Sequence, residues 1–240
     1  MSIQFPATPW SAILKARLEG NDQSREALTR LCEAYWHPLY VFLRAGGQRS
    51  EDAKDLVQGF FARFLERDYL QGLDPSIGKF RSYLLGALKH YVSNERERAN
   101  ARKRGGGIQP LPIEIDIRDD EGPRYAVEPP TSETAETVYE RQWAMSVLNN
   151  VIERLGKEYG NAGKGESYRH LSAFLPGALD PISYEEAAKR CAISIDAVRS
   201  AIHRLRQRYR EVLRFEISQT VSHVDEVDGE IRFLMEVIGR

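Results

Sequence analysis

The chain of 240 residues has few cysteines, no long apolar run and no secretory leader pattern. Its two cysteines, Cys32 and Cys191, are far apart and belong to no CxxC pair, so we expect reduced thiols and no disulfide framework. No apolar stretch approaches the ~20 residues that span a bilayer, and the first ten residues lack the basic and apolar parts of a signal peptide. We therefore expect a soluble, cytoplasmic protein with no membrane partner.

Catalytic and metal-binding motifs are also lacking. No Ser-His-Asp set and no HExxH motif is visible, and the five histidines are scattered. Residues 160–167 resemble a phosphate-binding loop only superficially, because that loop requires GxxxxGK[ST] after a β-strand, whereas here Gly165 follows the lysine. The sequence therefore predicts no enzyme, no cofactor and no metal.

Strand patterns are lacking as well, since nearly every patterned segment has helical period. We expect an all-α fold with two helical domains joined by an acidic flexible linker, the second domain containing a helix-turn-helix. The expected helices cover residues 10–18, 24–43, 50–65, 80–103, 134–155, 167–174, 184–190, 195–213 and 227–237.

Charge of one sign is concentrated in segments, although the chain as a whole carries a formal charge of −1. Residues 79–104 carry a net +6 and residues 183–214 a net +4. Residues 114–140 carry a net −7 and residues 216–240 a net −4. Two basic modules separated by an acidic connector are typical of a protein that binds nucleic acid at two places.

The domain boundaries follow from the same pattern. Residues 105–133 contain five prolines, four glycines and most of the acidic run, a composition that favours a linker. We therefore expect an N-terminal domain over residues 1–104, a linker over 105–135, a C-terminal domain over 136–215 and an acidic extension over 216–240.

The segment SYEEAAKRCAISIDAVRSAIHRLRQRYREVLR at residues 183–214 is the most informative part of the chain. Ser183 followed by Glu186 is a capping-box pattern that predicts a helix start at Tyr184. Residues 191–194 then predict a tight turn, after which Ser194 can cap a second helix. Two helices joined in this way are typical of a helix-turn-helix.

The second of these helices has an apolar stripe and an opposite basic face. The stripe comprises Ala197, Val198, Ala201, Ile202, Leu205, Tyr209, Val212 and Leu213. A solvated amphipathic helix would show the same stripe, but a row of cations after a tight capped turn favours DNA. We expect Arg199, Ser200 and His203 to read bases, while the later Arg204 and Arg206 meet phosphates.

Three segments resemble motifs of one family when they are taken in order. They are DAKDLVQGFFARFL at 52–65, KFRSYLLGALKHYVSNERER at 79–98 and ISIDAVRSAIHRLR at 193–206. The chain resembles bacterial RNA polymerase sigma factors of the extracytoplasmic-function group, in which such segments bind polymerase, melt the promoter and bind DNA. The resemblance implies a sigma factor that directs core polymerase to promoters for transcription initiation, and it implies that the second DNA-binding module recognises the −35 element.

The resemblance also assigns residues. Those implied to bind the clamp of the polymerase's largest subunit are Asp52, Asp55 and Gln58. Those implied to capture or open the −10 element are Ser76, Ile77, Gly78, Lys79, Lys89, His90 and Asn94. Those implied to contact the DNA backbone are Arg96, Arg98 and Arg102.

The expected partners are core RNA polymerase, promoter DNA and an inhibitor, which is either another protein or the chain's own C-terminal extension. Two other functions remain open. A stand-alone helix-turn-helix regulator would bind DNA without polymerase and would leave the helix at residues 50–65 without a role. An α-helical adaptor would bind only protein and would not need two basic segments.

Overall fold

The computed structural model describes residues 22–66, 79–102, 133–176 and 182–239, apart from the side chains of residues 22–32 and 101–102. Within these ranges the backbone forms helices and no strand, which confirms the expected all-α class. The helices are α2 (Asp22–Ala45), α3 (Ser50–Phe64), α5 (Phe80–Arg102), α6 (Ala135–Asn161), α7 (Gly165–Leu171), η2 (Ser172–Phe174), α8 (Tyr184–Cys191), α9 (Ile195–Ser218), η3 (Val224–Glu226) and α10 (Val227–Gly239).

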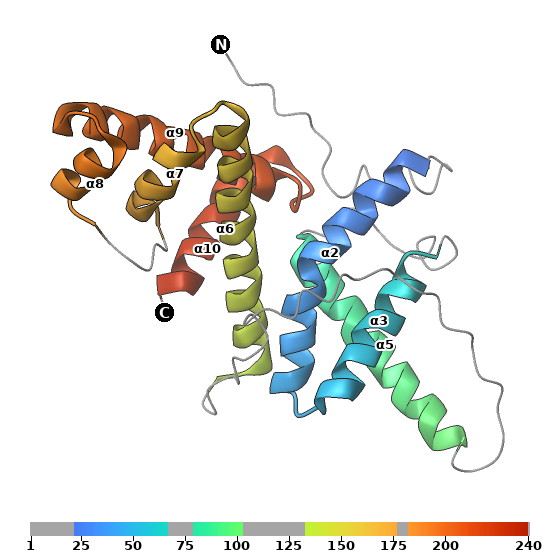
Figure 1. Cartoon of the computed structure of the whole chain (residues 1–240). Helices are drawn as coiled ribbons and strands as arrows, with labels where there is room; N and C mark the ends of the chain where they lie inside the picture. The colour runs from blue at the N-terminus through green and yellow to red at the C-terminus, as the bar shows by residue number, and fades with distance from the viewer. Residues whose placement is uncertain (1–21, 67–78, 103–132, 177–181, 240) are drawn as a thin grey trace.

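The long helix α6 lies at the centre of the arrangement, with α2, α3 and α5 on one side and α7, α8 and α9 on the other (Figure 1). It begins at the cap Thr134, whose hydroxyl accepts from the Thr137 amide at 3.2 Å. Its buried face includes Trp143, which is 1% exposed and whose indole N–H donates to the Tyr35 hydroxyl of α2 at 3.0 Å. A buried indole finds its partner on α2 in this way, so the contact between α2 and α6 has a defined register.

Helices α3 and α5 pack through aromatic rings. The Phe60 ring lies 5.5 Å from Phe64 and 5.8 Å from the Tyr91 ring of α5, measured between centroids. Close approach of the two helices depends on Gly59, because a Cβ at this position would lie 2.5 Å from the Tyr91 hydroxyl. The apolar stripe of α3 is buried at Ala53, Val57, Phe60, Phe61 and Phe64, and it is half-buried at Leu56 and Leu65.

The C-terminal helix α10 is joined to the start of α5 by a buried ionic cluster of Lys79, Arg81 and Glu230, called the Glu230 cluster below. Glu230 is 1% exposed and accepts from Arg81 Nε at 2.5 Å through Oε1. Its other oxygen lies 2.5 Å from Lys79 Nζ, an ion pair without the angles of a hydrogen bond. The Arg81 guanidinium also lies 3.9 Å from the centroid of the Phe233 ring, where cation–π attraction adds to the pairing.

Backbone contacts support the same junction. The Phe80 amide donates to the Thr220 carbonyl at 2.9 Å, and the Tyr139 hydroxyl donates to the Arg81 carbonyl at 2.9 Å. The start of α5 is therefore held both by α6 and by the segment that follows α9.

Most of the expected linker lies outside the described residues, so the division into two domains stays a prediction. The described helices on either side of that segment nevertheless share one apolar core, because α6 packs on α2 and α10 reaches α5. Among the described helices, none is long and apolar enough to cross a membrane.

We predict that Glu230→Leu lowers the free energy of unfolding by roughly 3 kcal/mol, because two cations lose their buried counter-ion. Chemical denaturation of the whole chain measures the loss. Adding Arg81→Met should recover part of it, since the most buried cation is then gone as well. The exposed Glu236→Gln on the same helix is the control and should change little. A Glu230→Leu chain as stable as the parent would contradict a structural role for the cluster.

Candidate nucleic-acid interface

Two capped helices form the expected DNA-binding segment. The Ser183 hydroxyl accepts from the Glu186 amide at 3.1 Å at the start of α8, and the Ser194 hydroxyl accepts from the Ala197 amide at 3.2 Å at the start of α9. Both caps expected from the sequence are therefore present. A full capping box would also have the Glu186 carboxylate accept from the Ser183 amide. Here that carboxylate accepts from Arg190 Nε at 2.8 Å instead, and this contact lowers the Glu186 pKa.

The turn between α8 and α9 contains a residue in the left-handed region. Ala192 ends α8 with φ of 53° and is the one non-glycine residue with positive φ in the described ranges. Its amide and that of Ile193 donate back to the Lys189 and Ala188 carbonyls at 3.3 and 3.1 Å. Helix C-termini with this geometry normally have glycine at this position. Ala192 therefore adopts a backbone conformation that its Cβ disfavours.

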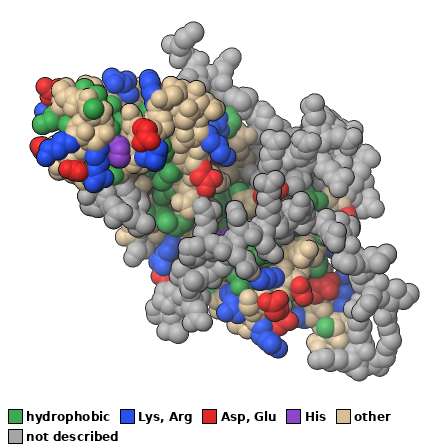
Figure 2. All heavy atoms as spheres, in the orientation of Figure 1, with side chains coloured by type: hydrophobic (Ala, Val, Ile, Leu, Met, Phe, Trp, Pro, Cys, Tyr) green, Lys and Arg blue, Asp and Glu red, His purple; other side chains and the backbone are tan. Residues whose placement is uncertain are grey.

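The first turns of α9 present polar side chains to solvent. The exposed residues of this face are Arg199, Ser200, His203, Arg204, Arg206, Gln207 and Arg210. Figure 2 shows Lys and Arg side chains gathered over the end of the molecule formed by α8 and α9, with carboxylates among them. The apolar stripe on the other side is buried at Val198, Ile202, Leu205, Tyr209, Val212 and Leu213.

The arginines of α9 differ in how far they are already engaged. Arg199 donates to Asp196 at 3.2 Å and lies 5.8 Å from the Tyr184 ring, and a pair this exposed is easily exchanged for another acceptor. Arg204 has no hydrogen bond or ion pair with any described residue. Arg206 donates twice to the Phe174 carbonyl, at 3.1 and 3.2 Å, so it braces the segment after α7. Arg204 is consequently the better candidate for a phosphate contact.

Arg208 belongs to another face of α9. Its guanidinium forms a two-pronged contact with Glu158 of α6, with both distances 2.9 Å. The pairing lowers the pKa of Glu158, so that carboxylate stays ionised. This fork fixes α9 on α6 and sets the direction in which the exposed face points.

A second basic surface lies along α5. Lys89 and His90 are exposed near its middle, and Arg96 and Arg98 are exposed further along. Lys89 donates to Glu136 of α6 at 2.7 Å, which lowers the Glu136 pKa. The His90 ring contacts the Asn94 amide at 3.2 Å. These residues lie at the surface, although Lys89 is paired with Glu136 and Arg98 with Glu95.

A hollow of about 310 Å³ opens beside this surface, between the end of α2 and the middle of α5. It is lined by Phe42, Leu43, Gly46, Gln48, Lys89, Val92, Ser93 and Arg96. An apolar floor with two cations at its rim suits a flat ring attached to a phosphate backbone.

Of the remaining residues that the resemblance assigns to DNA, the structure describes the side chain of Lys79 alone. Lys79 is half-buried in the Glu230 cluster, so it does not face solvent as a free cation. Ser76, Ile77 and Gly78 lie outside the described residues. Arg102 ends α5, and its side chain also lies outside the described part.

The expected polymerase-binding residues lie on the face of α3 opposite its apolar stripe. Asp52 and Asp55 are exposed and Gln58 is half-buried. No hydrogen bond or ion pair engages these three side chains within the described chain. The face is therefore polar, acidic and uncommitted.

Two features were missed from the sequence. Glu230 was counted only as part of an acidic extension, although it lies three residues after Val227 and four before Leu234, on the stripe that α10 buries. That spacing could have identified it as a core acid that needs a cationic partner. The second feature is a hollow of about 690 Å³ between α9 and α10, which could not be found in this way because it depends on how the two helices meet.

No protein-family model matches the chain, and no curated protein or solved structure matches it either. Within the described ranges, no group of three His, Cys, Asp or Glu side chains is placed to hold a metal ion. Function is therefore inferred from the surfaces of α3, α5 and α9 together with the sequence resemblance.

We predict that Ala192→Gly raises the free energy of unfolding by up to about 1 kcal/mol, because glycine adopts positive φ without the Cβ clash that alanine suffers. Thermal and denaturant unfolding measure the change. Ala201→Gly, within α9, is the matched control and should instead be destabilising by about 1 kcal/mol. A loss of stability in the Ala192 variant would contradict the left-handed turn.

Proposed function

We propose that the chain is a sigma factor of the extracytoplasmic-function type, a promoter-specificity subunit with no catalytic activity of its own. The observation that carries the proposal is the exposed start of α9, which follows a tight capped turn and presents Arg199, Ser200 and His203 side by side. A helix that begins in this way can enter the major groove with its first turns against base edges.

The division of work along α9 follows from the engagement of its arginines. Arg199 pairs with the exposed Asp196 near the Tyr184 ring and can exchange that carboxylate for a base edge. Arg204 is free to approach a phosphate, while Arg206 and Arg208 hold the surrounding helices in place. Base reading is thus assigned to the first turn and charge neutralisation to the next.

The surface of α5 supports a second DNA contact, as the family resemblance implies for the −10 element. Lys89 and Arg96 line the 310 Å³ hollow, and His90 and Asn94 each follow a lining residue along α5. A base taken out of the stack would find an apolar floor there, and its phosphate would meet cations. Strand opening would then proceed by exchange of stacking for these contacts, without ATP.

The acidic face of α3 supports polymerase binding. Asp52 and Asp55 have no partner of their own among the described residues and lie on the side that the core leaves free. This surface separates the proposal from a stand-alone regulator, which would have no use for it.

The C-terminal extension is our candidate for the inhibitor. It holds Lys79 through Glu230, so a residue implied to bind the −10 element is occupied while α10 stays in place. A chain with Glu230→Gln should then bind promoter DNA more tightly than the parent, provided that it stays folded.

We predict that Arg199→Ala and Arg204→Ala weaken DNA binding in different ways. Duplexes are first selected from a random pool by the parent chain, and binding is then measured by fluorescence anisotropy over a range of salt. Arg199→Ala should cost about 1–3 kcal/mol on the selected duplex and little on a scrambled one. Arg204→Ala should weaken both alike and lower the salt slope by about one unit.

The selection step is itself a test. A random pool that yields no preferred sequence would remove the assignment of α9 as a base-reading helix. Equal losses on both duplexes for Arg199→Ala would move that residue to the phosphate class and leave readout to Ser200 and His203.

We also predict that Asp55→Lys combined with Gln58→Lys abolishes co-elution with bacterial core RNA polymerase. The two lysines replace the negative charge of the α3 face with positive charge. Size-exclusion chromatography with core enzyme measures association, and circular dichroism checks the fold. Glu236→Lys, an exposed change on α10, is the control and should co-elute normally. A parent chain that binds DNA but never polymerase would favour the stand-alone regulator.

A further inference from the structure

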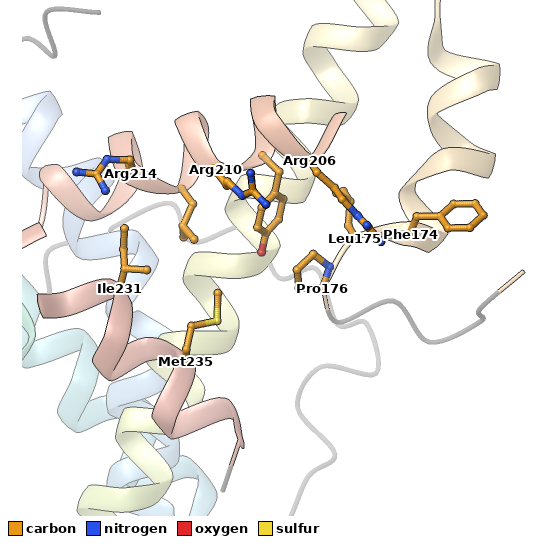
Figure 3. A pocket seen from close by; sticks show the side chains of 10 residues that line it. Phe174, Leu175, Pro176, Arg206, Arg210, Arg214, Ile231 and Met235 are labelled. Atoms are coloured by element: carbon orange, nitrogen blue, oxygen red, sulfur yellow. The ribbon is translucent and has the colours of Figure 1, made fainter. Parts of the chain in front are cut away.

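A hollow of about 690 Å³ lies between α9, α10 and the segment that follows η2. Its lining residues are Phe174, Leu175, Pro176, Arg206, Tyr209, Arg210, Leu213, Arg214, Ile231 and Met235. Figure 3 shows the three arginines in a row along α9, with Ile231 and Met235 of α10 across from Arg214 and Arg210, and with Leu175 and Pro176 near Arg206. None of the lining residues that the structure describes is acidic.

The walls are largely hydrocarbon and are incompletely covered. Leu175 and Leu213 are buried at the floor, whereas Met235 is 44% exposed at the edge. Covering water-exposed apolar surface with a hydrocarbon group lowers the free energy of the system. Hollows of this size accommodate small organic ligands, and such sites combine apolar walls with a few convergent polar groups.

The polar groups of the hollow include a donor that the protein does not use. Tyr209 is 3% exposed, and its hydroxyl is buried without a hydrogen-bond partner. Burial raises the pKa of Tyr209 to about 12, so the hydroxyl keeps its proton and can donate. Buried hydroxyl groups without partners are uncommon in native proteins, and one explanation is an acceptor that arrives with a ligand.

The three arginines are not equivalent. Arg206 donates to the Phe174 carbonyl, and Arg214 pairs with Asp228 of α10. Arg210 is exposed and has no hydrogen bond or ion pair with any described residue. Arg210 and Tyr209 both line the hollow, and one unpaired guanidinium with one unpaired hydroxyl donor can match the two oxygens of a single carboxylate.

We propose that this hollow binds an organic monocarboxylate with a hydrocarbon body, whose head is held by Arg210 and Tyr209 and whose chain lies against Leu213, Ile231 and Met235. The site does not depend on the proposed promoter function, since none of its ligand contacts involves the base-reading turn of α9. It is built jointly by α9 and by the C-terminal extension, so α10 must be in place for the ligand to bind.

The test uses the whole purified chain with octanoate as the probe, measured by isothermal titration calorimetry. Acetate carries the same head without the chain, and octan-1-ol carries the chain without the charge. Each should bind at least about tenfold more weakly than octanoate, because each lacks one of the two matching features. Bound octanoate should also raise the melting temperature with increasing concentration.

Variants separate the two features of the site. Arg210→Gln should weaken octanoate at least about tenfold and leave octan-1-ol unchanged. Tyr209→Phe should weaken octanoate by a smaller factor while it keeps the ring in the core. The matched control Arg232→Gln removes an exposed arginine of α10 that does not line the hollow, and it should have no effect.

Several results would overturn the proposal. One is no heat and no thermal shift with millimolar octanoate. Equal affinity for octanoate and octan-1-ol would mean an unspecific apolar surface, and equal affinity for acetate would mean a simple anion site. Unchanged octanoate binding by a folded Arg210→Gln chain would place the ligand elsewhere.

Discussion

The buried carboxylate of Glu230 is the contact on which the arrangement of the described helices depends. Removal of a carboxylate from water costs several kcal/mol, and the cost is offset only by close cations with good geometry. Arg81 supplies a contact of 2.5 Å from a guanidinium that is itself buried between Phe233 and Trp143. Because Arg81 begins α5 and Trp143 belongs to α6, this one charge holds three helices that are far apart in the sequence.

Two further ion pairs fix the basic surfaces of α9 and α5 on the central helix α6. The surface of α9 is fixed on α6 through Arg208 and Glu158, and the surface of α5 is fixed on α6 through Lys89 and Glu136. The first of these pairs is a two-pronged guanidinium contact, whereas the second is a single exposed pair that water and salt weaken. The hold of α6 on α5 through Lys89 is therefore the weaker of the two, and the buried Glu230 cluster supplies the stronger contact to α5.

The sequence predicted features that depend on neighbours in the chain. The all-α class and the caps at Ser183 and Ser194 follow from spacings of three and four residues, which carry over directly into helices. The pairing of Arg81 with Glu230 could not be read in this way, because 149 positions separate the two residues and nothing local distinguishes Arg81 from its basic neighbours. The contacts that Lys79 and Arg206 make within the chain could not be predicted for the same reason, because their partners, Glu230 and the Phe174 carbonyl, come from other elements.

Helix α10 joins the proposed ligand site to the ionic cluster through its own geometry. Glu230 and Leu234 are four residues apart on the face that the core buries, while Ile231 and Met235 are displaced by one position and face the hollow. Adjacent positions on an α-helix differ by about 100°, so α10 presents Glu230 to the core and Ile231 and Met235 to the hollow. Because the Glu230 cluster fixes α10 on the start of α5, it also fixes Ile231 and Met235, which line the hollow.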